Sequence, residues 1–204
     1  MFVLENADDD PTSDNWVEKG QIVTPIDSFA LDATTEVIDG VQYLVWAQKD
    51  PAIEGNSNLY IARMANPWTL GSEPVMLTKP EYDWECIDFL VNEGPAFLLH
   101  GDKIYITYSA SGTGVPYAVG LLTAERGSDL LDKASWSISF LQRCNNSASH
   151  SAEFIWQSCV SSRSGIIGSC RCARIPKWEI PPETAFTWRS MPPPLRKSVS
   201  RPVA

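Results

Sequence analysis

Short runs of β-branched and aromatic residues, separated by turn residues, dominate the first two thirds of the chain. Residues 41–47 and 103–108 are such runs, and each follows a Gly at a turn, Asp39-Gly40 or His100-Gly101. Glycine supplies the positive φ that tight hairpin turns need. A further run follows each hairpin, over residues 58–63 and 117–122. The pattern predicts antiparallel strands and an all-β fold.

The two hairpins belong to a repeat of about sixty residues. A carboxylate, Asp32 or Glu93, precedes the hairpin Gly by eight residues in both copies. A three- or four-stranded unit at this period favours propeller blades, and a β-sandwich with two similar hairpins is the alternative. We interpret residues 26–88 and 89–141 as two blades. The opening Met1-Phe2-Val3-Leu4 resembles a late half-blade, so the chain carries about two and a half blades.

Composition narrows the class of protein. The chain has 204 residues, a formal net charge of −9 and 44% hydrophobic residues, which indicates a globular fold. The acidity argues against a nucleic-acid partner, and no apolar run reaches the ~20 residues of a membrane span. The N-terminus lacks the basic and apolar segments of a signal peptide.

The charge is distributed unevenly. Residues 1–141 carry 22 acidic and 7 basic side chains, whereas residues 142–204 carry 3 acidic and 9 basic ones, with four of the five Cys. We therefore divide the chain into a partial propeller, 1–141, and an irregular, poorly ordered C-terminal tail, 142–204. A shifted reading frame is our first interpretation of the tail; a disordered basic tail and a small disulfide-rich module are the alternatives.

Asp32 and Glu93 are the first candidates for chemistry. Equivalent positions of successive blades face one another across the central channel, so the repeat predicts that both carboxylates point into one pocket. A pair of carboxylates performs glycoside hydrolysis, one as acid and one ionised, and like charges brought close raise one pKa. The alternative is that both side chains are structural.

Several motifs resemble glycoside hydrolase family 43, and its α-L-arabinofuranosidases most of all. They are Ala30-Leu31-Asp32-Ala33-Thr34, residues 60–68, residues 80–85 and, most specifically, Asn92-Glu93-Gly94-Pro95. The resemblance covers residues 1–138. It implies a five-bladed propeller that cleaves arabinose or xylose linkages with inversion, and secretion from the cell.

The resemblance also implies residue roles. Glu93 matches the general acid, and Asp32 matches the aspartate that tunes the pKa of that acid. No residue matches the general base, which in the family belongs to the first blade, so we expect this chain to be a catalytically impaired fragment. Some relatives hold a metal ion through a later His motif; no such motif is recognisable here, and we expect no cofactor.

Three residues are candidates for substrate binding: Trp84, Asn92 and Tyr108. The expected partner is a pentose-containing plant polysaccharide such as arabinan or arabinoxylan, with the protein acting as a monomer. The aromatic rings of Trp84 and Tyr108 could stack on a pentose or fill the blade core. A non-catalytic pentose-binding β-module and a β-xylosidase-type specificity are the alternatives for function.

Overall fold

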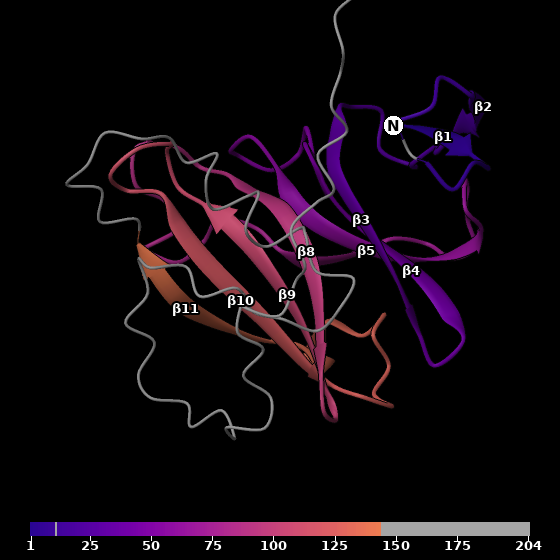
Figure 1. The fold of residues 1–204 in the computed structure, drawn as a ribbon. Helices are drawn as coiled ribbons and strands as arrows, with labels where there is room; N and C mark the ends of the chain where they lie inside the picture. The colour runs from indigo at the N-terminus through magenta and orange to yellow at the C-terminus, as the bar shows by residue number, and fades with distance from the viewer. Residues whose placement is uncertain (11, 144–204) are drawn as a thin grey trace, which may run out of the picture. The chain divides into compact units, whose positions relative to one another are not determined.

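The structure is a computed structural model that describes residues 1–10 and 12–143. Those residues form strands and a single 3₁₀ turn, which confirms the all-β prediction (Figure 1). The elements are β1 Phe2–Asn6, β2 Trp16–Gln21, β3 Ala30–Ile38, β4 Val41–Gln48, β5 Asn58–Asn66, β6 Thr69–Leu70, β7 Val75–Thr78, β8 Asn92–His100, β9 Lys103–Ala110, β10 Ala118–Glu125, η1 Lys133–Ser135 and β11 Ser137–Arg143.

Each copy of the sequence repeat forms its own antiparallel sheet. The first sheet has the order β3-β4-β5, with β6 and β7 both paired to β5, and the second has the order β8-β9-β10-β11. The hairpin of β1 and β2 is a separate two-stranded sheet. Strand β11 continues to Arg143, and the tail interpretation for residues beyond it lies outside the described part of the chain.

The second of the two hairpin turns differs by one residue from the sequence prediction. Asp39 and Gly40, with φ of 51° and 81°, form the expected two-residue loop between β3 and β4. In the second hairpin the loop is Gly101-Asp102, because His100 is still paired to Lys103 as the last residue of β8. Gly101 has a φ of 57°, so glycine still supplies the left-handed conformation.

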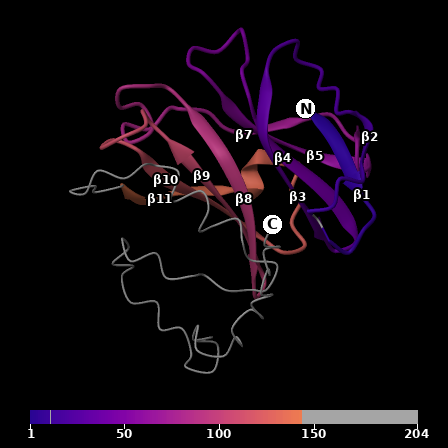
Figure 2. The ribbon, with the colours of Figure 1, turned by 45° about the horizontal axis from the view of Figure 1, so that its top comes forward.

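The first sheet is buried on both of its faces. Val45 and Ala47 face a core shared with Ile104 and Ile106 of the second sheet, whereas Leu44 and Trp46 belong to a second core with the first hairpin. Figures 1 and 2 show the first sheet between the β1–β2 hairpin and the second sheet. A strand covered on both faces needs a continuous apolar run, which explains the pattern of β4.

Within the described residues, no helix has the length and apolar character that crossing a membrane requires.

Candidate active site

A β-bulge interrupts the first strand of each large sheet. In β3 the pairing with β4 shifts between Leu31 and Thr34, so Asp32 lies within the bulge. In β8 the pairing with β9 shifts between Glu93 and Ala96, so Gly94 lies within the second bulge. Bulges bend a strand and re-aim its side chains, and they are frequent beside active sites.

The bulges correct the equivalence that the sequence repeat predicts. Within the two bulges, Asp32 and Gly94 have positive φ angles of 54° and 58°. Each lies two positions before the residue at which pairing with the neighbouring strand resumes. Gly94, not Glu93, is therefore the counterpart of Asp32. The prediction was wrong by one position because the hairpin glycines that anchored it occupy different places in their turns.

Asp32 nevertheless reaches the segment that carries Glu93. The Gly94 amide donates a hydrogen bond of 3.1 Å to Oδ2 of Asp32 across the two sheets. This contact joins residues that are 62 positions apart in sequence. A non-glycine residue with positive φ is strained unless its surroundings hold it, and the contact with Gly94 holds Asp32.

Glu93 lies half-buried beside Asp32 and Tyr117. The Tyr117 hydroxyl, from the segment that leads into β10, donates a hydrogen bond of 3.1 Å to Oε1 of Glu93. Burial raises the pKa of Glu93; the hydrogen bond from Tyr117 acts against this rise, and the negative charge of Asp32 adds to it. Glu93 in this site therefore keeps its proton at pH values at which ordinary carboxyl groups have lost theirs.

Asp32 and Tyr117 have shifted titrations of their own. Burial raises the pKa of Asp32, and the hydrogen bond from the Gly94 amide acts in the opposite direction. Burial raises the pKa of Tyr117, and the charges of Glu93 and Asp32 contribute to that rise. Tyr117 is therefore a hydrogen-bond donor throughout the physiological pH range.

A third carboxylate, that of Glu85, is fully buried and accepts a hydrogen bond from Asn92, the residue before Glu93. Its Oε2 accepts hydrogen bonds of 3.0 Å from the amides of Glu81 and Tyr82. Its Oε1 accepts from Nδ2 of Asn92 at 3.1 Å and from the hydroxyl of Tyr108 at 2.8 Å. Four donors compensate the desolvation of one charge.

Asn92 and Tyr108 are therefore directed at Glu85. Asn92 has no exposed surface and Tyr108 is 1% exposed. Direct contact of either side chain with a substrate stays a prediction. In the structure, the two side chains connect strands β8 and β9 to the Glu85 carboxylate.

Trp84 is partly buried within a group of aromatic rings. Its ring lies 6.1 Å from that of Tyr82, nearly parallel at 9°, and 5.3 Å from that of Phe140. Tyr82 and Phe140 are exposed, at 43% and 46%. Of the three candidate substrate-binding side chains, Trp84 is the one that retains accessible surface, and its contact with a sugar stays a prediction.

Sequence reasoning missed the roles of Glu85 and Tyr117. Glu85 follows Trp84 in a segment without strand periodicity, and nothing local marks its carboxylate as buried. Tyr117 contacts Glu93 only because β10 lies beside β9, which lies beside β8. Both contacts depend on packing between segments that are distant in sequence.

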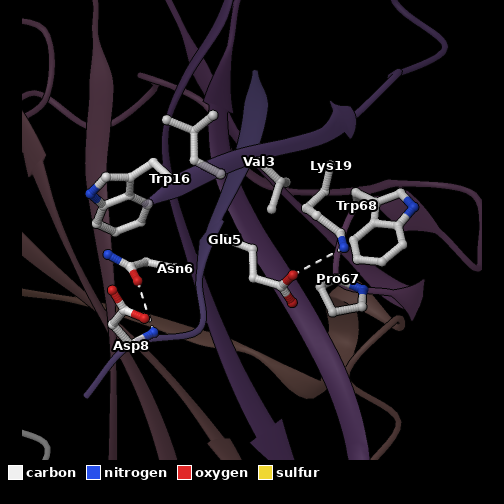
Figure 3. A pocket seen from close by; sticks show the side chains of 9 residues that line it. Val3, Glu5, Asn6, Asp8, Trp16, Lys19, Pro67 and Trp68 are labelled. Atoms are coloured by element: carbon white, nitrogen blue, oxygen red, sulfur yellow. Dashed lines mark hydrogen bonds and ion pairs between the residues drawn. The ribbon is translucent and has the colours of Figure 1, made fainter. Parts of the chain in front are cut away.

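A cavity of about 340 Å³ lies elsewhere in the described residues, and neither Asp32 nor Glu93 lines it. Figure 3 shows Lys19 there, between Glu5 and the ring of Trp68. The Lys19 ammonium lies 3.0 Å from the Glu5 carboxylate and 5.2 Å from the centre of the Trp68 indole. Lys19 therefore forms an ion pair and a cation–π contact within this chain. The lining residues are Val3, Leu4, Glu5, Asn6, Asp8, Trp16, Lys19, Pro67 and Trp68.

Among the described residues, no three His, Cys, Asp or Glu side chains gather closely enough to hold a metal ion.

Comparison with known proteins identifies the family of the chain. The family model of glycosyl hydrolases family 43 matches residues 1–151. The chain belongs to this family. The match includes both bulges and every residue of the site described above.

Two proteins similar to the chain are named as arabinofuranosidases. An extracellular exo-alpha-(1->5)-L-arabinofuranosidase of Streptomyces avermitilis is 50% identical over 137 residues, which are 67% of this chain and 28% of that protein. The enzyme of the same name from Streptomyces chartreusis is 48% identical, over 67% of this chain and 42% of that protein.

A solved structure similar to the chain is also that of an arabinofuranosidase. The crystal structure of an α-L-arabinofuranosidase from Lactobacillus brevis has a TM-score of 0.66 and 58% identity, and the match covers 68% of this chain and 43% of that one. The chain thus spans less than half the length of each of these relatives.

Proposed function

We propose that this chain supplies the acid side of an inverting α-L-arabinofuranosidase. Glu93 is the general acid, and Asp32 is the carboxylate that keeps Glu93 protonated. The substrate is a terminal α-L-arabinofuranosyl residue of arabinan or arabinoxylan. Two of the relatives are named for this kind of activity and described as extracellular, which supports an extracellular role here.

The observation that carries the proposal is the hydrogen bond between the Gly94 amide and Asp32. It brings a second carboxylate to the residue adjacent to Glu93. Burial and the Asp32 charge both raise the pKa of Glu93, so the acid holds a proton at a pH where ordinary carboxyl groups have lost it. Proton donors in glycoside hydrolysis need this property.

The chemistry follows from the protonation of Glu93. Glu93 transfers its proton to the glycosidic oxygen as the bond from that oxygen to C1 breaks. Water attacks C1 from the opposite face, and a general base takes a proton from the water. Glu93 is left ionised and must regain a proton from solvent before the next cycle.

The motifs that resemble the family supply an acid, Glu93, and a tuning aspartate, Asp32, but no residue of the chain matches the family's general base. General acid–base catalysis by one group contributes typically 10²–10⁴-fold. We therefore propose that the chain by itself hydrolyses arabinofuranosides slowly or not at all.

We propose further that the two large sheets are two blades of a five-bladed propeller and that the protein acts as a monomer. The burial of both faces of the first sheet supports the blade arrangement, because stacked blades cover each other in this way.

A phenyl α-L-arabinofuranoside with added azide tests the role of Glu93. Azide bonds to C1 without a base, the bond from C1 to oxygen breaks, and phenol leaves with the proton of Glu93. We expect azide-dependent phenol release by the parent chain, a loss of 10²-fold or more in Glu93→Gln, and no loss in Glu36→Gln, a partly buried carboxylate of β3. Equal release by parent and Glu93→Gln would contradict the role. Rapid hydrolysis without azide would contradict the acid-side proposal.

The accessible surface of Trp84 favours a second candidate, a non-catalytic pentose-binding module. Calorimetric titration with arabino-oligosaccharides separates the two. Binding that survives Glu93→Ala and disappears in Trp84→Ala, without azide-dependent release, favours the module. Binding that needs both residues, together with azide-dependent release, favours the glycosidase.

A further inference from the structure

Glu85 is a buried charge that the proposed chemistry does not use. A carboxylate without exposed surface is costly unless several donors compensate for the lost water. All four donors to Glu85 come from its own loop or from strands β8 and β9. The position of this carboxylate therefore depends on the loop and, in turn, constrains the two strands.

The hydrogen bond from Asn92 to Glu85 fixes the residue next to the proposed acid, Glu93. Asn92 is the first residue of β8 and directly precedes Glu93. Its side chain donates to Glu85, and its backbone is held by Ser57: the Asn92 amide donates to the Ser57 carbonyl at 3.0 Å, and the Ser57 hydroxyl donates to the Asn92 carbonyl at 3.0 Å. The residue before Glu93 thus has side chain and backbone fixed together.

The contact with Tyr108 acts on the other side of the bulge. Tyr108 lies in β9 opposite the two residues of the β8 bulge, Gly94 and Pro95. Its ring packs against Gly120 of β10, where an added Cβ would lie 2.3 Å from Cζ of the ring. Glu85 thus connects Asn92, which precedes Glu93, to Tyr108, which lies opposite the bulge that follows Glu93.

The loop that carries Glu85 is itself anchored to Ser111, the residue that follows β9. The hydroxyl of Ser111 donates to the Trp84 carbonyl at 2.8 Å and accepts from the Ile87 amide at 3.0 Å. Ser111 has a φ of 70°, a conformation that a non-glycine residue adopts only when its surroundings hold it. Glu85 is therefore a fixed point against which the bulge of β8 can be set.

We propose that Glu85 is a positioning residue for Glu93, acting through Asn92 and Tyr108 to set the β8 bulge that aims the acid at Asp32. The inference rests on the proposed function for its catalytic meaning, but its structural part is independent of turnover. Without Glu85, the bulge relaxes and Glu93 moves away from Asp32 toward solvent.

Carboxyl-detected NMR of the full chain tests the positioning without activity. We expect Glu85→Gln to lower the titration midpoint of Glu93 and to shift the Gly94 amide resonance, while Asp83→Asn changes neither. Asp83 is exposed in the same loop and is the matched control. An unchanged Glu93 midpoint and Gly94 resonance in a folded Glu85→Gln would overturn the inference, whether or not the chain turns over substrate.

Tyr108→Phe is a second variant, for use if Glu85→Gln does not fold. It removes one donor to Glu85 and keeps the aromatic ring, and we expect a smaller change of the Glu93 midpoint in the same direction. A Tyr108→Phe chain with parental values would likewise overturn the inference.

The azide assay then adds the functional readout. We expect Glu85→Gln to lower kcat about tenfold or more, because small misplacements of a catalytic group are costly, with KM changed less than twofold. If Glu93→Gln has no effect in that assay, the proposed function fails while the NMR result still decides the positioning. If Glu93→Gln abolishes release and Glu85→Gln lowers only the affinity, the inference fails and the function stands.

Discussion

Gly120→Ala is a direct test of the packing beneath the site. The added Cβ would lie 2.3 Å from Cζ and 2.5 Å from Cε1 of Tyr108, and 2.7 Å from Cη2 of Trp84. Ordinary carbon contacts are ~3.5 Å or more, so the Tyr108 ring must move by about 1 Å. A shift of that size removes the 2.8 Å hydrogen bond from Tyr108 to Glu85.

The expected cost combines two effects. Overpacking a core typically costs about 1–3 kcal/mol, and a hydrogen bond to a charged group contributes about 1.5–3 kcal/mol. We therefore expect Gly120→Ala to lower the free energy of unfolding by about 2.5–6 kcal/mol. For a chain of this size this corresponds to a decrease in Tm of roughly 5–24 °C.

Denaturant unfolding of four chains measures the two effects separately. Tyr108→Phe removes the hydrogen bond without overpacking, so it should cost about 1.5–3 kcal/mol. In the double variant the hydrogen bond is lost only once, so its cost should be smaller than the sum of the single costs. A Gly120→Ala chain within about 0.5 kcal/mol of the parent would refute the packing of Tyr108 over Gly120.

Two further predictions concern the protonation of Glu93. Tyr117→Phe removes the hydrogen bond that lowers the pKa of Glu93, so we expect a higher titration midpoint by NMR; a lower midpoint would contradict the assigned contact. Glu93→Gln should stabilise the chain near neutral pH but not well below pH 4.5, its ordinary pKa. Because the folded chain holds a proton that the unfolded chain releases, stability falls as pH rises from the ordinary pKa through the raised one. Equal unfolding free energies of Glu93→Gln and parent at both pH values would contradict the raised pKa.

The sequence allowed the strands to be predicted, because alternating apolar runs bounded by glycine turns identify antiparallel hairpins. Asp39-Gly40 was placed correctly, and the runs after each hairpin became β5 and β10. The residue of the second sheet that corresponds to Asp32 was not predictable. A bulge adds a residue to one strand without a reliable mark in the sequence, so alignment on Gly101 gave an offset of one position.

The burial of site residues was also beyond the sequence. Tyr108 and Trp84 lie in similar aromatic contexts, yet Tyr108 is almost fully buried and Trp84 keeps accessible surface. Gly120 of the neighbouring strand leaves room for both rings, but Tyr108 alone of the two reaches the buried Glu85 carboxylate with a side-chain hydrogen bond. Glu85 has the residue type of a surface loop, and only the four donors around it make its burial possible.

The most direct test of the account is the titration of Glu93 with and without the charge of Asp32. Carboxyl NMR measures the Glu93 midpoint in the parent chain and in Asp32→Asn. Asn can still accept the Gly94 hydrogen bond but carries no charge. The account predicts a midpoint above the ordinary value in the parent and a lower one in Asp32→Asn, with part of the elevation retained because burial persists. Identical midpoints in the two chains would show that the carboxylates do not share a site.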